Sequence, residues 1–291
     1  MILRKRDFNI NIVKLSNYLK FILVFIFFLF PACKENKNTA QPSETVKSII
    51  DIDGSINRVR NSHYLYVGTD PSTDLPFIGK DKETKEFTGF EVEIAEYLAK
   101  NFGVNLKLVP TPWNRLFNNL SARNYDIALN AIELPEDDKI LEKFAFSVPY
   151  YLSYIQIVVL KSDKKTYGIA DFKKRNVGVI KNSVSEILLN ETNRIKKTDI
   201  KIKSHLKVDE LFDSLRNKEI NGVLISSPFA QWYCLNSPTL KITGDKFLKH
   251  TYVIAVNKKD IALLNALNAI LKKAKYDKDF KRIFIKWGMK N

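Results

Sequence analysis

Residue types that mark several common protein classes are scarce in this 291-residue chain. Two cysteines cannot build a disulfide scaffold or a four-thiolate zinc site. Ten glycines are too few for a glycine-rich, low-complexity or collagen-like chain. The three histidines, His63, His205 and His250, have no second histidine or carboxylate at ligand spacing, so we expect no metal site. The sequence also lacks a phosphate-binding glycine loop, a G-x-S-x-G elbow and a nucleophile beside a base. We therefore expect no cofactor and no catalytic residue.

Long hydrophobic runs are also missing, except for one near the N-terminus. Residues 21–32 read FILVFIFFLFPA, which is shorter than the roughly 20 residues of a membrane-spanning helix. A basic segment precedes the run, and this combination is typical of an export signal. The run ends at Ala32-Cys33, which is similar to a bacterial lipoprotein signal, although Phe30 stands where that motif usually has leucine. We expect residues 1–32 to be a lipoprotein signal peptide and Cys33 to carry the lipid; a soluble exported protein and an uncleaved anchor are the alternatives.

Acidic residues are fewer than basic ones, 32 against 47, and the formal net charge is +15. Removal of residues 1–32 would leave 42 basic and 31 acidic residues, a net charge of +11. The lysines are scattered singly, so we expect a solvated basic surface near anionic lipid rather than a nucleic-acid site. Lipidation of Cys33 would leave Cys234 without a disulfide partner, and its apolar neighbours favour a buried, inert thiol over a reactive one.

The hydrophobic pattern after the signal is that of an α/β protein. The polar residues 34–45 indicate a flexible tether, and folded sequence is expected to begin near Tyr64. Residues 64–69 are rich in β-formers, and residues 90–102 place apolar side chains on one helical face that ends at Gly103. Further strands and helices alternate along the chain. They are expected at residues 105–109, 113–123, 126–132, 154–160, 176–180, 184–189, 252–256, 260–274 and 279–287.

Two segments of the sequence resemble each other. Residues 116–131, LFNNLSARNYDIALNA, and residues 211–226, LFDSLRNKEINGVLIS, share an apolar helix pattern that leads into a short strand. Either any two αβ units look alike, or the chain has two similar lobes that present strand ends to a shared cleft. Ligands of open α/β sheets bind beyond the carboxyl ends of the strands. A turn rich in Asn and Ser at residues 181–185 offers an oxyanion-binding corner, with an ordinary helix N-cap as the alternative.

Seven short stretches occur in one order over residues 64–288. They are Val67-Gly68-Thr69-Asp70 with Pro76-Phe77, residues 87–95 (FTGFEVEIA), Pro112-Trp113 with Asn124-Tyr125-Asp126, residues 146–151 (FSVPYY), Val177-Gly178-Val179 with Ser183, Ser227-Pro228, and residues 284–288 (FIKWG). Together they resemble the family 3 extracellular solute-binding proteins, the receptors of polar amino-acid ABC transporters. Each stretch alone is weak, but seven in order are specific.

The resemblance implies a two-lobed type II periplasmic-binding-protein fold, in which each lobe is a sheet flanked by helices. Lobe I would comprise residues 60–152 plus 253–291, and lobe II residues 153–252, joined by a two-strand hinge near Tyr151 and Thr251. Residues 33–59 would be the lipidated cysteine and its tether. The implied function is capture of a small polar, nitrogen-containing, amino-acid-like solute by a monomer tethered to the bilayer, and its delivery to an ABC permease. A ligand-sensing or partner-binding lipoprotein of the same fold is the alternative, and an enzyme is not expected.

The expected ligand site combines family positions with nearby charged residues. It consists of Asp70, Asp74, Phe77, Trp113, Asn130, Glu133, Asp138, Lys181, Ser183 and Ser226. By resemblance, Asp70 and Phe77 belong to the first binding loop, and Trp113 to an apolar wall suited to stacking or cation–π contact. Asn130 and Glu133 replace hydroxyl residues of the family, and Ser183 lies at the turn that receives an α-carboxylate.

Two positions depart from the family pattern. Asp137 and Asp138 follow Pro135-Glu136, where the family has an arginine that holds the α-carboxylate, and Ser226 replaces the aspartate that takes the α-ammonium. An ordinary α-amino acid is therefore not the expected ligand. The acids of lobe I favour a cationic or polar nitrogenous ligand, although Lys181 could serve an anion.

Overall fold

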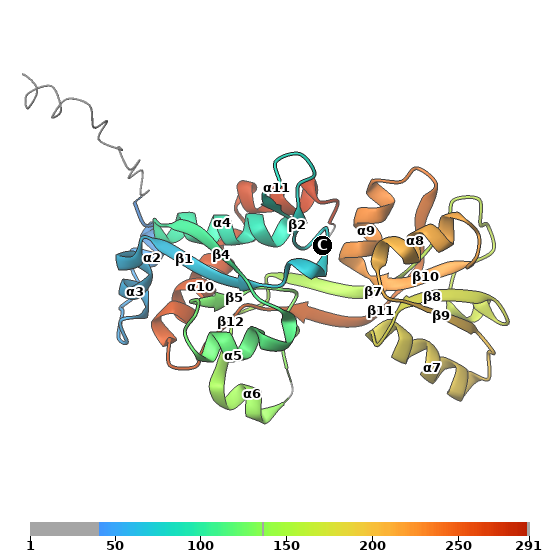
Figure 1. Ribbon diagram of the computed structural model, residues 1–291, viewed down its shortest axis with the longest axis horizontal. Coiled ribbons are helices and arrows are strands. Elements are labelled where there is room, and N and C mark those ends of the chain that lie inside the picture. The colour runs from blue at the N-terminus through green and yellow to red at the C-terminus, as the bar shows by residue number, and fades with distance from the viewer. Residues whose placement is uncertain (1–40, 136, 290–291) are drawn as a thin grey trace, which may run out of the picture. The chain divides into compact units, whose positions relative to one another are not determined.

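The computed structural model describes residues 41–135 and 137–289. The expected signal peptide and Cys33 lie outside these residues. The described part contains two five-stranded sheets with helices packed around them, so the predicted α/β class with two helix-flanked sheets is confirmed (Figure 1). We call the part built on the first sheet lobe I and the part built on the second sheet lobe II. None of the helices in the described residues is both long and apolar enough to cross a bilayer.

Lobe I is built on a sheet with the strand order β4-β1-β5-β12-β6. In it, β1 pairs in parallel with β4 and β5, while β12 runs antiparallel to β5 and β6. Its strands are β1 (Tyr64–Thr69), β4 (Asn105–Pro110), β5 (Ile127–Ala128), β6 (Phe144–Phe146) and β12 (Ala255–Asn257), and a hairpin adds β2 (Gly79–Lys80) and β3 (Phe87–Thr88). Its helices are α2 (Glu44–Lys47), α3 (Ser55–Ser62), α4 (Phe90–Phe102), α5 (Leu116–Ser121), α6 (Asp138–Lys143), α10 (Ile261–Ala274) and α11 (Lys278–Lys286), with the 3-10 turns η1 (Pro71–Thr73) and η2 (Trp113–Arg115).

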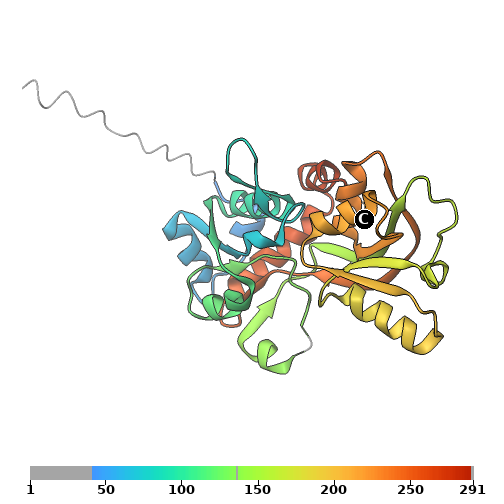
Figure 2. The ribbon, with the colours of Figure 1, turned by 45° about the vertical axis from the view of Figure 1, so that its right-hand side comes forward.

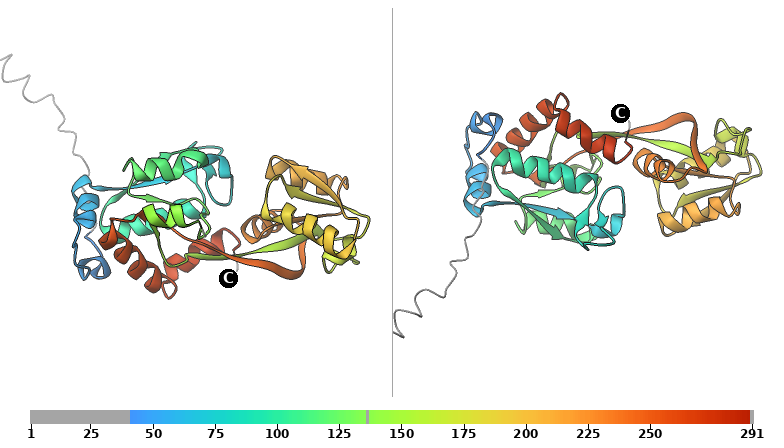
Figure 3. Two further views of the ribbon diagram at one scale, coloured as in Figure 1. Left: turned by 90° about the horizontal axis from the view of Figure 1, so that it is seen from below. Right: turned by 90° about the horizontal axis from the view of Figure 1, so that it is seen from above.

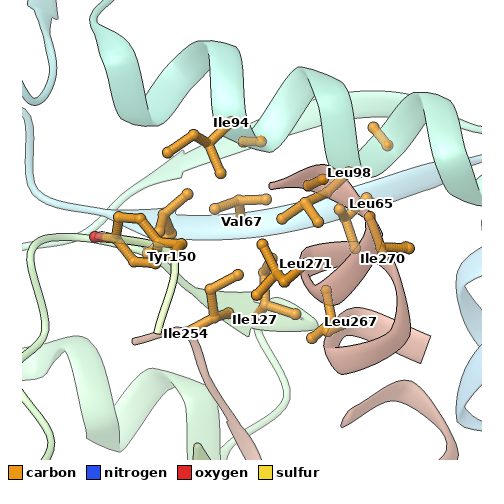
Figure 4. Close-up of a cluster of buried hydrophobic side chains, with 14 of the residues drawn as sticks. Leu65, Val67, Ile94, Leu98, Ile127, Tyr150, Ile254, Leu267, Ile270 and Leu271 are labelled. Atoms are coloured by element: carbon orange, nitrogen blue, oxygen red, sulfur yellow. The ribbon is translucent and has the colours of Figure 1, made fainter. Parts of the chain in front are cut away.

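The core of lobe I follows the predicted helix pattern. Helix α4 buries Phe90, Ile94, Leu98 and Phe102 on one face and ends at Gly103, which has φ 71° as a left-handed C-cap requires. Figure 4 shows this face and α10 packed on the same side of β1 and β5, where their side chains form one buried cluster. Burial of apolar surface contributes about 25 cal/mol per Å², so this cluster stabilises the lobe.

Lobe II has the strand order β11-β7-β10-β8-β9. Strands β8, β9 and β10 pair in parallel, and β7 runs antiparallel to both β10 and β11. Its strands are β7 (Tyr151–Leu160), β8 (Asn176–Ile180), β9 (Lys201–His205), β10 (Gly222–Ser226) and β11 (Leu240–Tyr252). Its helices are α7 (Val184–Lys196), α8 (Val208–Arg216) and α9 (Ser227–Leu235), with the 3-10 turn η3 (Ile169–Phe172).

The chain passes between the two sheets twice, once from β6 into β7 and once from β11 into β12. Strands β7 and β11 pair along their length, with Tyr151 opposite Tyr252 and Leu152 opposite Thr251 at the end nearest lobe I. Figure 1 and Figure 2 show these two long strands side by side as they run from one lobe into the other. The remaining strands of each sheet belong to one lobe alone.

The packed part of lobe I begins earlier than the sequence analysis places it. Residues 44–59, which we assigned to the tether, include α2 and most of α3, and both helices lie against lobe I in the two views of Figure 3. Val46, Ile56 and Val59 are buried in the core of this lobe. The Arg58 side chain also forms ion pairs, at 3.2 Å to Asp126 and 2.7 Å to Asp260. The segment is polar on average, so its few apolar residues gave a weak helix signal.

Candidate functional site

A cavity of about 930 Å³ lies between the two lobes. Its walls come from the loop after β1, the end of β5, the loops after β8, β9 and β10, and the two long strands. The carboxyl ends of parallel strands therefore face it from both lobes, as expected for a ligand site in α/β sheets. The lining residues are Ser72, Thr73, Asp74, Phe77, Ala131, Glu133, Ile155, Ile180, Asn182, Ser183, Val184, Ser185, Leu206, Lys207, Val208, Asp209, Leu224, Ile225, Ser226, Phe229, His250 and Tyr252.

The Asn130 side chain anchors the loop that follows β1, which we call the first loop. Its side chain is buried, and its amide oxygen accepts hydrogen bonds of 2.8 Å from the Thr69 hydroxyl and from the Asp70 amide. Its amide nitrogen donates to the Thr73 hydroxyl at 2.9 Å. These three hydrogen bonds tie the loop to the segment that follows β5, beside the cavity residue Asp74.

Asp70 supports the same loop. Its carboxylate accepts hydrogen bonds from the Ser72 amide at 2.9 Å and from the Trp113 amide at 2.8 Å. The indole of Trp113 is half exposed, and neither Asp70 nor Trp113 belongs to the lining of the cavity. The Asp70 side chain thus holds its loop against the backbone of Trp113, and neither side chain forms part of the cavity wall.

Two carboxylates reach the cavity from opposite lobes. Asp74 comes from the first loop of lobe I, and Asp209 from the start of α8 in lobe II. Partial burial raises the pKa of the Asp74 carboxyl above its ordinary value, the negative charge of Asp209 raises it further, and Lys207 opposes both effects. Asp209 accepts a hydrogen bond from the hydroxyl of Tyr233. The carboxylates of Asp74 and Asp209 therefore repel each other across the cavity.

Aromatic rings form an apolar part of the wall. Phe77 is 1% exposed, and its ring centre lies 5.1 Å from that of Phe229 in lobe II and 5.7 Å from that of Tyr252 on β11. These spacings are those of favourable aromatic pairs. The contact between Phe77 and Phe229 joins the two lobes directly.

A histidine and an acid lie near the hinge strands. The Nε2 atom of His250 is 3.7 Å from a Glu133 carboxylate oxygen and 3.4 Å from the Tyr252 hydroxyl. The backbone of Glu133 forms an antiparallel bridge with Tyr252, which places the segment that follows β5 beside β11. Burial raises the pKa of the Tyr252 hydroxyl, so this group stays protonated and can donate.

The Ser183 turn is an N-cap, the alternative left open by the sequence. The Ser183 hydroxyl accepts from the Glu186 amide at 3.3 Å, and the Asn182 amide donates to the Glu186 carboxylate at 2.6 Å. Ser204 donates a further hydrogen bond to that carboxylate, and these bonds lower the pKa of Glu186. A carboxylate of the chain itself therefore occupies this corner.

A buried acid lies directly behind the cavity wall. The Glu91 carboxylate accepts a 2.7 Å hydrogen bond from the amide of Ala131, a lining residue, and another from the Tyr150 hydroxyl. Its second oxygen has no partner among the described residues. Burial raises the pKa of Glu91 from its ordinary 4.5 to about 7.

The structure brings half of the expected site residues to this cavity. Those that line it are Asp74, Phe77, Glu133, Ser183 and Ser226. Those outside its lining are Asp70, Trp113, Asn130, Asp138 and Lys181. Of the latter, Asp138 is exposed on α6 and Lys181 is exposed in the turn before α7.

Sequence reasoning missed Lys207, Asp209, Phe229, His250 and Tyr252 as lining residues. The first two follow β9, a strand that we did not predict because its KIKSH sequence alternates weakly and is largely exposed. The rule that ligands lie beyond the carboxyl ends of strands would have found them once β9 was recognised.

Two α/β lobes that are joined by a pair of long strands and enclose a partly polar cavity are typical of solute-binding proteins. The family model of bacterial extracellular solute-binding proteins, family 3, matches residues 65–290, and the chain belongs to this family. The predicted resemblance is confirmed. Among the described residues, no three His, Cys, Asp or Glu side chains lie close enough together to hold a metal ion.

Individual relatives agree with this assignment. The L-cystine-binding protein TcyJ of Escherichia coli (strain K12) is 29% identical over 245 residues, which cover 84% of this chain and 89% of TcyJ. The ABC transporter arginine-binding protein 1 of the same strain is 24% identical over 208 residues, covering 69% and 82%. Among solved structures, the ancestral cationic amino-acid solute-binding protein AncCDT-1 has a TM-score of 0.73 at 26% identity, covering 80% of this chain and 99% of that one. A second AncCDT-1 structure, with a TM-score of 0.65 at 27% identity over the same shares, is described as a precursor of cyclohexadienyl dehydratase.

Proposed function

We propose that this protein captures a small polar, nitrogen-containing, amino-acid-like solute in the cavity between its lobes and delivers it to an ABC importer. The observation that carries the proposal is the cavity itself. It receives polar groups from the strand ends of both lobes, and its volume of about 930 Å³ lies within the range of small-molecule sites. The names of its relatives, which include cystine- and arginine-binding proteins, support an amino-acid-like solute and an ABC transporter as partner.

Closure about the two connecting strands would complete the capture. We propose that lobe I, with residues 44–152 and 253–289, and lobe II, with residues 153–252, rotate about a hinge near Tyr151 and Thr251. A solute that contacts both lobes favours the closed form, because it gains contacts there that the open form lacks. The permease would then recognise the closed, loaded protein.

Export and lipid anchoring are the second part of the proposal. The support is the sequence of residues 1–33, with its basic start, its short apolar run and the Ala32-Cys33 step. The wild-type chain should incorporate a fatty-acid label and sediment with membranes, whereas Cys33→Ser should do neither. Equal labelling of both chains would contradict the anchor and leave the solute site untouched.

Calorimetric titration tests the solute site. The purified protein is titrated with the common amino acids, with diamines and polyamines, and with organic acids. At least one nitrogen-containing solute should bind with a stoichiometry near one and raise the unfolding temperature. Saturation by organic acids alone would contradict a nitrogenous ligand, and the absence of binding throughout the panel would contradict solute capture.

We further propose that the protein binds its solute without converting it. Its curated relatives are named binding proteins, although the AncCDT-1 description connects the fold to a dehydratase. Incubation with the bound solute should return that solute unchanged by mass spectrometry, and a new product would contradict the proposal.

A further inference from the structure

The cavity is acidic within a basic chain. Three carboxylates line it, those of Asp74, Glu133 and Asp209, together with the ammonium group of Lys207 and the imidazole of His250. The whole chain, in contrast, has a formal net charge of +15. In the described part of the chain, no arginine contributes to the lining. Because basic residues dominate the composition, the excess of acid here is a local property of the site.

In the described residues, the Asp74 carboxylate is unpaired, whereas the Asp209 carboxylate is held in position. No hydrogen bond or ion pair within the described residues involves the carboxylate of Asp74. Asp209 is oriented by the Tyr233 hydroxyl, and the Tyr233 ring stacks on Phe212 with 3.8 Å between ring centres. Lys207 has its own exposed partner, Glu210, at 3.6 Å. Two like charges on opposite lobes repel, and a cation placed between them would turn that repulsion into attraction.

The groups that could hold a carboxylate are already engaged or replaced. The Ala131 amide at the end of β5 donates to Glu91, and the Asn182 amide before α7 donates to Glu186. The family's carboxylate-binding arginine has Asp137 and Asp138 in its place, and both are exposed on the surface. Each of these features makes the site less favourable for an anionic group.

From these contacts we infer that the cavity selects a cation that lacks a carboxylate, namely a diamine, polyamine or guanidine, held between Asp74 and Asp209. Its methylene chain lies along Phe77 and Phe229, the apolar part of the wall. The inference narrows the class of solute within the proposed function and rests on that function.

Agmatine and arginine form the decisive pair of probes. They share the guanidinium group, the methylene chain and the terminal amine, and they differ in the carboxylate that only arginine has. Titration of the purified protein should give a dissociation constant for agmatine at least ten-fold lower than for arginine. Equal or tighter binding of arginine would overturn the inference.

The outcomes separate the inference from the proposed function. Binding of arginine or another amino acid in preference to its decarboxylated form leaves solute capture standing and refutes the choice of class. Failure of every solute in the full panel refutes solute capture and the inference with it.

Substitutions locate the cation. Asp74→Asn and Asp209→Asn should each weaken agmatine binding at least ten-fold, because each removes a charged hydrogen-bond acceptor but keeps the size of the side chain. Asp213→Asn is the matched control. It removes one charge from the same helix, α8, but Asp213 pairs with Arg216 at 2.7 Å and lies outside the lining. Agmatine affinity within two-fold of wild type is expected for this control.

Thermal unfolding of each variant shows whether the fold is intact. If Asp213→Asn weakened agmatine binding as much as Asp74→Asn does, the assignment of the cation to the cavity would be overturned. So would wild-type agmatine affinity in both Asp74→Asn and Asp209→Asn.

Discussion

The buried Glu91 makes the stability of the protein depend on pH in a predictable direction. Burial raises the pKa of this carboxyl from 4.5 to about 7 in the folded state. Between these two values the folded state holds a proton that the unfolded state has lost, so the free energy of unfolding falls as the pH rises. Below pH 4.5 both states are protonated, and above pH 7 both are ionised, so the change is confined to that window.

The magnitude follows from the size of the shift. A shift from 4.5 to about 7 corresponds to about 3 kcal/mol, at 1.36 kcal/mol per pKa unit. That is a large part of the roughly 5–15 kcal/mol by which proteins of this kind are stable. The side chain is only 2% exposed, so solvent does little to screen its charge.

Glu91→Gln is the variant that isolates the effect. The Gln oxygen can still accept the hydrogen bonds from Tyr150 and from the Ala131 amide, and the side chain no longer titrates. Urea unfolding of both proteins, followed by circular dichroism from pH 4 to pH 8, gives the difference in their free energies of unfolding. This difference should change by about 3 kcal/mol in favour of the variant between pH 4.5 and pH 7.

Comparing the two proteins at each pH cancels the titration of the remaining groups. Tyr150→Phe provides a second check. The Tyr150 hydroxyl lowers the pKa of Glu91 by its hydrogen bond, so its removal should move the wild-type transition to higher pH. Parallel curves for wild type and Glu91→Gln would refute the reasoning, because they would mean that Glu91 titrates alike in the folded and unfolded chains.

Three further substitutions test the packing around the site. Phe77→Ala should lower the free energy of unfolding by about 3–5 kcal/mol in urea, since the ring is buried among aromatic neighbours; a loss below 1 kcal/mol would contradict that packing. Asp260→Ala should cost about 2 kcal/mol and speed hydrogen exchange in α3, because it leaves Arg58 and Arg123 without their shared carboxylate; unchanged exchange would show that α3 is held otherwise. Trp113→Ala should leave both solute affinity in calorimetry and stability (within about 0.5 kcal/mol) near wild type, because the half-exposed indole lies outside the cavity lining and the backbone amide that donates to Asp70 is kept; a ten-fold loss of affinity would place the indole at the solute.

The parts of the fold with strong periodicity could be predicted from the sequence. The apolar face of α4 and its end at Gly103 are where the pattern places them, because burial and a left-handed cap leave clear signals. Helix α3 was missed because only Ile56 and Val59 mark its buried face, and the ion pairs of Arg58 involve residues distant in the chain. A single sequence does not display such long-range pairs.

The candidate site was predicted in outline for a related reason. Strand ends identify which loops meet, and this places Asp74, Glu133 and Ser226 at the cavity. The same rule cannot say which way a polar side chain turns. Asn130 follows a strand as a ligand residue would, yet its side-chain amide forms hydrogen bonds with Thr69, Asp70 and Thr73 instead.

The central claim is that a solute occupies the cavity between the lobes, and a variant that fills this space tests it most directly. Ser226 lines the cavity at the start of α9, and Ser226→Trp would place an indole there. Calorimetry of wild type and variant with the same solute panel, after both show cooperative unfolding, should give one site in the wild type and none in the variant. A solute that binds both proteins equally would contradict the claim.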